Sequence, residues 1–157
     1  MRNDVAMRSS TYLSTSLHEL FHQASLIPAG ANCLQLEMLD GVTRELTEVL
    51  IGRFFVFGLA EDQQSWCLLR LGSVSALRFQ SDLSQPSPQV TWTRKAPAEL
   101  ISSLTLPAIA SISFREQPRK NVDVVLLGAS RSLLATDSYQ VPFIPIQAIS
   151  RLEISSS

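Results

Sequence analysis

The sequence predicts a mostly β protein: an N-terminal helix followed by two repeated small, strongly bent β-barrel-like modules. Two observations carry this prediction. Apolar and polar residues alternate with a period of two along much of the chain. The chain also contains one segment twice, since residues 68–79 (LLRLGSVSALRF) align with residues 143–154 (FIPIQAISRLEI) when shifted by 75 positions. Two copies are too few for a solenoid, so we expect two similar modules in tandem.

These modules divide the 157 residues into four parts. Residues 1–13 lack periodicity and are expected to be a disordered tail. Residues 14–80 hold the helix and the first β-barrel module, and residues 81–98 form a Pro/Ser linker. Residues 99–157 form the second β-barrel module.

The N-terminal helix is predicted by its start signal and its apolar face. Ser16 precedes Glu19 by three residues, which is the capping-box spacing, and Pro28 to Gly30 end the helix. The residues at i, i+3, i+4 and i+7 are apolar: Leu17, Leu20, Phe21 and Ala24.

In the first module, alternation predicts a strand from Cys33 to Met38, and Asp40-Gly41 predicts a hairpin turn. The return strand runs to Ile51, and Gly52 is expected to permit a bend or bulge there. The predicted strand 54–57 is apolar throughout, which indicates burial on both faces.

The rest of the first module consists of a turn and two closing strands. The chain is expected to turn over 58–65, and strands 66–71 and 74–79 then complete the module on either side of a kink at Gly72-Ser73.

Between the modules, Val90 and Trp92 could form a short edge strand, and Pro97 could open a short helix. In the second module, residues 109–114 fit either a helix or a strand. The repeat favours a strand, as do Ser111 and Ser113, which are poor helix formers.

Later strands of the second module are predicted over 122–126 and, as one long terminal strand, over 139–154. Pro142 and Pro145 fall within that last strand. Each lacks a backbone N–H, so each must sit at an edge, a bend or a bulge.

The bent strands and the closing sequence VPFIPIQAISRLEI resemble the Sm-like and PRC-barrel folds, which have modules of this size. The whole chain also resembles a loosely defined group of short actinobacterial hypothetical proteins. The resemblance implies a fold and supplies no activity.

Composition narrows the choice of partner. The chain is 45% hydrophobic and 17% charged, with a net charge of −1, so it has no global attraction for nucleic acid or anionic membranes. The first module is acidic and the second mildly basic. No apolar run approaches the length of a membrane span, and the N-terminal residues hold no apolar signal core, so we expect a cytoplasmic protein. Cys33 and Cys67 are expected to be buried thiols.

One motif resembles a metal site. His18-Glu19-Leu20-Phe21-His22 matches H-E-x-x-H, which in zinc metallopeptidases places two histidines one helical turn apart. No further histidine exists as a third ligand, so Glu37, Glu45 or Glu48 would have to serve, and all three lie on predicted strands. We therefore favour an ordinary surface helix and keep the metallopeptidase as an alternative.

No other group of residues indicates catalysis. The sequence has no glycine-rich phosphate loop and no G-x-S-x-G nucleophile elbow. We expect a non-enzymatic protein with no cofactor.

The favoured function is a protein–protein interaction or adaptor module with an unidentified partner. Trp92, Trp66 and Tyr139 are the candidate interface aromatics, although the same side chains could instead close the barrels. The alternative is RNA binding by an Sm-like protein, carried by basic residues near Trp92: Arg94, Lys95, Arg119 and Lys120. Self-association into a homo-oligomer is compatible with both.

Overall fold

A computed structural model describes residues 5–8, 31–62, 64–80, 90–117 and 120–155. The first half of the chain forms β1 (Val5–Arg8), β2 (Cys33–Met38), β3 (Thr43–Ile51), β4 (Phe55–Ala60), β5 (Ser65–Arg70), β6 (Val74–Gln80) and β7 (Val90–Trp92). The second half forms α2 (Pro97–Ser102), β8 (Ala108–Phe114), β9 (Asn121–Ser130), β10 (Leu133–Thr136), β11 (Phe143–Pro145) and β12 (Ile149–Ser155). The mostly β prediction is confirmed, and α2 is the one α-helix among the described residues.

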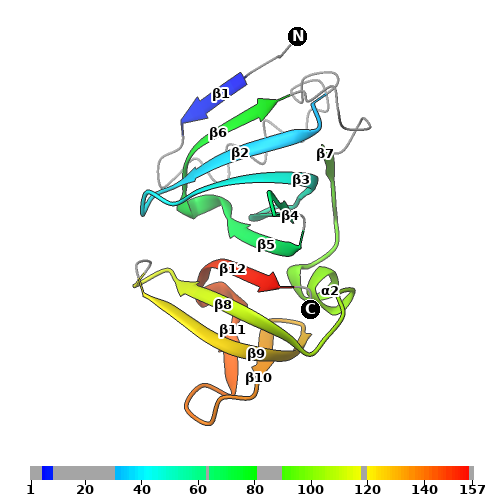
Figure 1. Cartoon of the computed structure of the whole chain (residues 1–157), viewed down its shortest axis with the longest axis vertical. Coiled ribbons are helices and arrows are strands. Elements are labelled where there is room, and N and C mark those ends of the chain that lie inside the picture. The colour runs from blue at the N-terminus through cyan, green and yellow to red at the C-terminus, as the bar shows by residue number, and fades with distance from the viewer. Residues whose placement is uncertain (1–4, 9–30, 63, 81–89, 118–119, 156–157) are drawn as a thin grey trace.

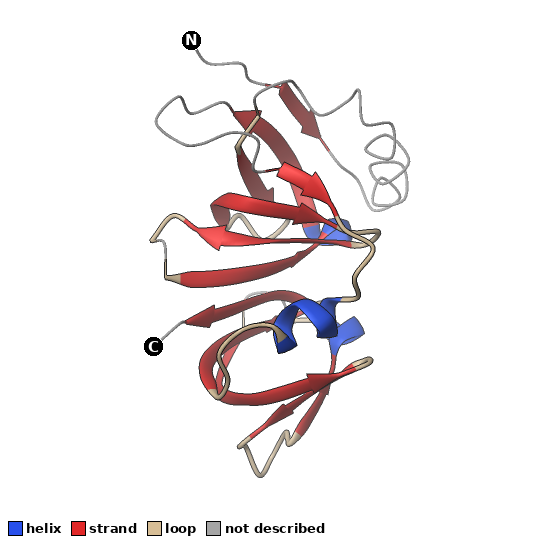
Figure 2. Cartoon of the chain, turned by 90° about the vertical axis from the view of Figure 1, so that its right-hand side faces the viewer, coloured by secondary structure: helices blue, strands red, loops and turns tan. Residues whose placement is uncertain are grey.

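The strands form one open sheet, not two separate barrels. The order is β1-β6-β2-β3-β4-β5-β12-β8-β9-β10-β11 with antiparallel pairing, and β7 joins β3 in parallel (Figure 1). The halves share a sheet because β12, the last strand, pairs with β5 over Arg151↔Leu69 to Ser155↔Ser65. Figure 2 shows the helical segments near the level where the halves meet.

The first half begins as the alternation predicts. Leu34, Leu36 and Met38 are buried on one face of β2, and the turn Asp40-Gly41 leads into β3. Gly41 has a φ of 89°, which a glycine adopts without steric cost, and the Asp40 carboxylate accepts the Val42 N–H at 3.1 Å.

The bend in β3 lies earlier than the sequence suggests. The register of β3 against β4 shifts between Thr47 and Leu50, and Glu48 there has a φ of 51°. Gly52, the expected position, instead lies in the tight turn after β3, where its N–H donates to the Phe55 carbonyl at 2.9 Å. The bulge therefore lies at Glu48, a residue type that does not predict a bulge.

The prediction of burial on both faces is confirmed for β4. Val56 faces the first core, whereas Phe55 and Phe57 face the second. Phe54 is the exception, since it precedes β4 and is exposed. The predicted turn over 58–65 is also shorter than expected, because Gly58 to Ala60 continue the strand.

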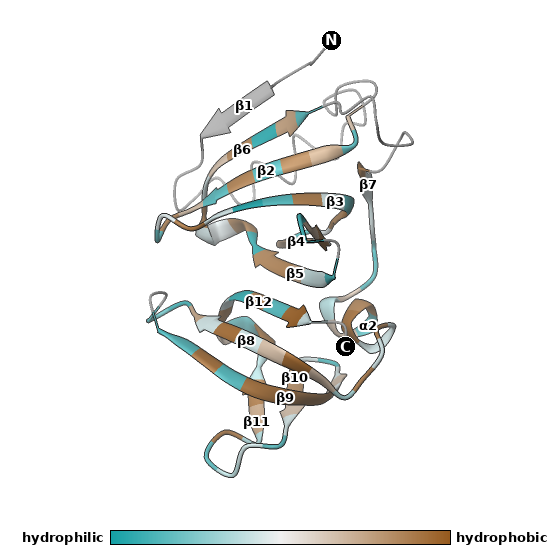
Figure 3. Ribbon diagram, in the orientation of Figure 1, coloured by the Kyte–Doolittle hydropathy of each residue, from teal (hydrophilic) through white to brown (hydrophobic). Residues whose placement is uncertain are grey.

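Two hydrophobic cores lie on opposite sides of the shared sheet region. The first is built from β2 to β7, around Leu34, Leu36, Leu69, Leu77 and Phe79. The second fills the second half, and it also takes in Phe55, Phe57 and Leu68 from β4 and β5. In Figure 3 the brown apolar positions along the strands alternate with teal ones, as this two-sided arrangement requires.

The repeated segments have matching secondary structure. The 3-10 turn Leu71–Ser73 joins β5 to β6, and the 3-10 turn Ile146–Ala148 joins β11 to β12. Val74 and Ile149, which are 75 positions apart, each begin the following strand and are both buried. The two segments therefore share one order of elements: a strand, a 3-10 turn and a further strand.

In the second half, one predicted strand is wrong and others are confirmed. The single terminal strand predicted over 139–154 is wrong, because the chain forms a loop, β11, a 3-10 turn and β12 instead. Pro145 in β11 and Pro142 just before it lie at the outer edge of the sheet, one of the places where prolines are tolerated. Residues 109–114 are in a strand, and β7 and α2 form where expected.

The N-terminal part differs from the expected tail. Val5–Arg8 pair antiparallel with β6 over Val5↔Phe79 to Arg8↔Ala76. An open sheet edge offers backbone partners to almost any extended segment, so no periodicity was needed for β1 to form. The predicted N-terminal helix and residues 81–89, half of the predicted linker, lie outside the described residues.

A buried arginine joins the two halves. Arg151 on β12 contacts Asp40, in the β2–β3 turn, at 3.0 Å, and its Nη2 donates to the Ser113 hydroxyl at 2.9 Å. The side chains of Arg151 and Asp40 are 7% and 5% exposed. Arg44 of β3 pairs in turn with Glu153 of β12.

Both cysteines are buried thiols, as predicted. Cys33 donates its S–H to Glu45 at 3.2 Å. Burial, together with the nearby Glu153 carboxylate, raises the pKa of Cys67 to about 12. None of the helices in the described part of the chain has the length and apolarity to cross a membrane.

Candidate functional site

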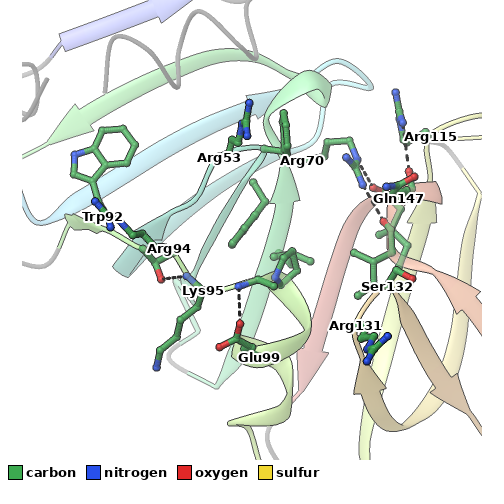
Figure 4. A pocket seen from close by; sticks show the side chains of 18 residues that line it. Arg53, Arg70, Trp92, Arg94, Lys95, Glu99, Arg115, Arg131, Ser132 and Gln147 are labelled. Carbon is green, nitrogen blue, oxygen red and sulfur yellow. Dashed lines mark hydrogen bonds between the residues drawn. The ribbon is translucent and has the colours of Figure 1, made fainter. Parts of the chain in front are cut away.

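A cavity of about 860 Å³ lies where the two halves meet (Figure 4). Its floor is apolar and comes from both halves, with Phe55 and Leu68 on one side and Ile146 and Ile149 on the other. The chain segment from Trp92 to Pro97, which connects β7 to α2, forms another wall. The cavity exists because β5 and β12 pair side by side at this place.

The cavity is lined by cations. Six of the chain's 13 lysines and arginines line it, but only one of its 14 acidic residues does. These cations are Arg53, Arg70, Arg94, Lys95, Arg115 and Arg131. Since the chain as a whole has a net charge of −1, the residues outside the lining carry a net negative charge, whereas positive charge is concentrated at the cavity.

The cavity cations have no carboxylate partners in the described residues. The ion pairs found there belong to Arg44 and Arg151, which lie outside the cavity. Glu99, the one acidic residue of the lining, accepts the backbone N–H of Ala96 at 3.3 Å at the start of α2. The positive charge is therefore left for a ligand from outside the chain.

Arg70 and Arg115 both donate hydrogen bonds to carbonyls in or next to the 3-10 turn between β11 and β12. Arg70 donates to the carbonyls of Ile149 and Ile146, both at 2.9 Å, and Arg115 donates to the Gln147 carbonyl at 3.3 Å. Burial and then the like charge of Arg115 lower the pKa of Arg70. Carbonyl oxygens fix the direction of these guanidinium groups without neutralising them.

Two aromatic rings stand at the cavity beside the cations. Phe54 is 51% exposed, and the Arg53 guanidinium lies 5.2 Å from the centre of its ring. Trp92 is half-buried and packs against the first core. A cavity with cations and accessible aromatic faces can bind phosphate groups and stack planar groups at the same time.

The basic residues predicted from the sequence are only partly brought together. Arg94 and Lys95 line the cavity, as does Arg115, which belongs to the same basic region of the sequence. Lys120 is exposed just before β9 and is not part of the lining, and Arg119 lies outside the described residues.

The candidate interface aromatics have three different environments. Trp66 is half-buried and stacks on Phe57, with ring centres 5.2 Å apart and planes 10° apart. Trp92 borders the cavity, and Tyr139 is fully exposed in the loop before β11. Of the three, only Tyr139 presents its whole side chain to solvent.

Three lining cations were missed by sequence reasoning. Arg53 stands alone beside a strand, Arg70 ends β5, and Arg131 lies in the β9–β10 turn with a φ of 52°. They are far apart in the sequence and come together only through the β5–β12 pairing. Arg53 next to the aromatic run 54–57 was the one available signal.

The alternative function, a zinc metallopeptidase, depends on the H-E-x-x-H motif. His18 and His22 lie outside the described residues. Within the described ranges, no group of three or more histidine, cysteine, aspartate or glutamate side chains is placed to hold a metal ion.

Neither a family model, a curated protein nor a solved structure matches this chain.

Proposed function

We propose that this protein is a non-enzymatic nucleic-acid-binding protein and that the junction cavity holds single-stranded RNA. The observation that carries the proposal is a cavity lined by six cations, which have no carboxylate partners among the described residues, and by the aromatic residues Phe54 and Trp92. Phosphate contacts supply most of the affinity in such complexes, and aromatic stacking adds contacts with the bases.

The positions of the charges favour RNA binding over protein binding, whereas the sequence alone favoured protein binding. A net charge of −1 favoured a protein partner, because an evenly spread charge would give no attraction for a polyanion. Local potential, not net charge, governs the approach of a charged ligand to a concave site. The acidic remainder of the surface would also orient an RNA strand toward the cavity.

We also propose that the two halves are repeats of one small Sm-like or PRC-barrel-like module. The same strand order occurs in each half, β6-β2-β3-β4-β5 in the first and β12-β8-β9-β10-β11 in the second. Both halves also place a 3-10 turn before their last strand, at positions 75 apart.

Fluorescence anisotropy with a labelled single-stranded RNA of about 10 nucleotides tests the function, since such sites contact roughly 4–16 nucleotides. The double variant Arg53→Gln/Arg94→Gln should bind more weakly at low salt. The slope of log affinity against log salt should become shallower by about 0.7 for each phosphate that the variant no longer neutralises. Both side chains are exposed, and neither forms an ion pair with the described residues.

Two further variants separate the contributions. Phe54→Ala should weaken binding by roughly fivefold or more at every salt concentration, because stacking of a base contributes about 1–3 kcal/mol and carries no charge. Arg78→Gln is the matched control: Arg78 is exposed on β6, outside the cavity, so RNA affinity should be unchanged. An equal decrease in affinity in Arg78→Gln and the double variant, or no decrease in either, would reject the cavity as the binding site.

A protein partner remains the second candidate function. The exposed apolar side chains Leu127, Leu133 and Phe143 on β9, β10 and β11 favour it.

A further inference from the structure

The outer face of β10 and β11 carries large apolar side chains that nothing in the described chain covers. Leu133 is 42% exposed and Phe143 is 65% exposed. The strand pairing Leu133↔Pro145 and Ala135↔Phe143 places them on the same side of the sheet, since their neighbours Leu134 and Ile144 are buried in the second core. We call Leu133, Ala135 and Phe143 the outer face.

The equivalent face of the first half is buried. Phe143 corresponds to Leu68 by the 75-residue offset. The pairs Phe57↔Leu68 and Phe55↔Arg70 then match Ala135 with Phe57 and Leu133 with Phe55. Phe55, Phe57 and Leu68 are at most 7% exposed, because the second half of the chain packs on them.

The strand edge on which such an outer face could dock is the edge of β6, which is equivalent to the edge of β12. In the second half, Arg151 to Ile154 of β12 pair with β5. The corresponding residues of β6, Ala76 to Phe79, pair with β1. Strand β1 thus occupies on β6 the position that β5 occupies on β12.

From these two correspondences we infer that the outer face docks on the first half of a second copy of this chain. Strand β11 of one copy lies beside β6 of the next, in place of β1, and so repeats the β5–β12 junction between molecules. This contact is independent of the nucleic-acid site, and its partner is fixed by continuity with the junction already present within each chain.

The prolines of β11 do not prevent this pairing. The carbonyl of Pro142 accepts the Thr136 N–H at 2.9 Å, so Pro142 directs its backbone toward β10 and away from the outer edge. Pro145 corresponds to Arg70, which lies outside the β5–β12 register. Phe143, the equivalent of Leu68, keeps its backbone N–H and carbonyl directed outward.

The contact joins two different surfaces, so it is head-to-tail and can extend to further copies or close into a ring. Strand β1 limits it, because β1 must leave β6 before β11 can take its place. Release of β1 should therefore increase association.

Sedimentation velocity over a range of protein concentrations, without nucleic acid, tests the inference on the full chain. The variant Ala6→Pro/Met7→Pro weakens β1, since N–H groups of successive strand residues point to opposite sides and one of the two prolines must remove a bond to β6. We expect this variant to form a faster-sedimenting species that grows with concentration and exceeds that of the unmodified chain.

Adding Phe143→Glu to the proline variant should abolish the faster species, since a carboxylate would be buried at the contact. Ile109→Glu is the control, because Ile109 is 64% exposed on β8, away from the outer face, and should leave association unchanged. Far-UV circular dichroism confirms that each variant is folded. A folded proline variant that stays monomeric throughout, or association that survives Phe143→Glu, would overturn the inference.

Discussion

At the scale of single residues, Arg151 forms the buried ion pair between the two halves. Its guanidinium reaches from β12 to Asp40 in the first half and to Ser113 in the second. Both charged side chains are almost fully buried, so each depends on the other for its stabilisation. An unpaired carboxylate in this position would be costly, because burial removes most of its hydration.

Arg151→Ala should therefore lower the free energy of unfolding by about 3–5 kcal/mol, the usual decrease when one member of a buried ion pair is removed. Urea denaturation followed by circular dichroism measures this change. Arg78→Ala, at an exposed position on β6, serves as the control and should stay within about 0.5 kcal/mol of the unmodified chain. A small effect of Arg151→Ala would mean that water reaches Asp40 and replaces the arginine.

At the scale of elements, the bend of β3 depends on one residue in a left-handed conformation. Glu48 has a φ of 51° and an exposed side chain, and the register against β4 shifts around it. A bulge of this kind sharpens the twist of a strand and lets β3 pair with both β2 and β4. The strain lies in the backbone, because the exposed Glu48 side chain forms no ion pair with the described residues that would hold it there.

Glu48→Gly should raise the free energy of unfolding by up to about 1 kcal/mol. The left-handed conformation costs a non-glycine residue roughly 1–2 kcal/mol, and the greater freedom of glycine in the unfolded chain offsets part of that gain. Glu48→Val should lower stability by at least about 1 kcal/mol, because a β-branched residue resists this conformation most. Thermal unfolding of the two variants should thus give shifts of opposite sign, and shifts of the same sign would show that the bend does not depend on this residue.

The sequence predicts the elements better than their connections. Alternation identifies β2, β6 and β9, and the 75-residue repeat correctly favours a strand for β8 over an equally periodic helix. The bulge at Glu48 and strand β1 escape prediction, since a left-handed glutamate and an edge strand held by backbone bonds leave no side-chain pattern. The cavity is hidden for a related reason: Arg53, Arg70 and Arg131 meet only after β12 has paired with β5.

At the scale of the whole molecule, the two cores are not independent. Phe55, Phe57 and Leu68 belong to strands of the first half but pack in the second core. Val56 and Leu69, their immediate neighbours, pack in the first core. The pair of strands β4 and β5 is therefore common to both, and loosening one core removes support from the other.

The chain should unfold in a single transition despite its two halves. Trp66 and Trp92 report fluorescence near the junction, and far-UV circular dichroism reports the whole sheet, so the two signals should change together in urea. Phe57→Ala should shift both curves equally, by about 3–5 kcal/mol for removal of a buried aromatic ring. Phe54→Ala, which removes an exposed ring, is the control. Two separable transitions would show that the halves are independent domains.

The central position of β12 has a consequence for how the protein is made. A ribosome synthesises this strand after all the others in the sheet, yet its partner is β5, which emerges roughly eighty residues earlier. Throughout that interval the nascent chain presents the edge of β5, with Phe57 and Leu68 beside it, to every other polypeptide nearby. Unpaired edges beside apolar side chains are where folding intermediates aggregate. Translation speed and chaperone binding over the second half of the message should therefore influence yield more than the stability of the finished fold does.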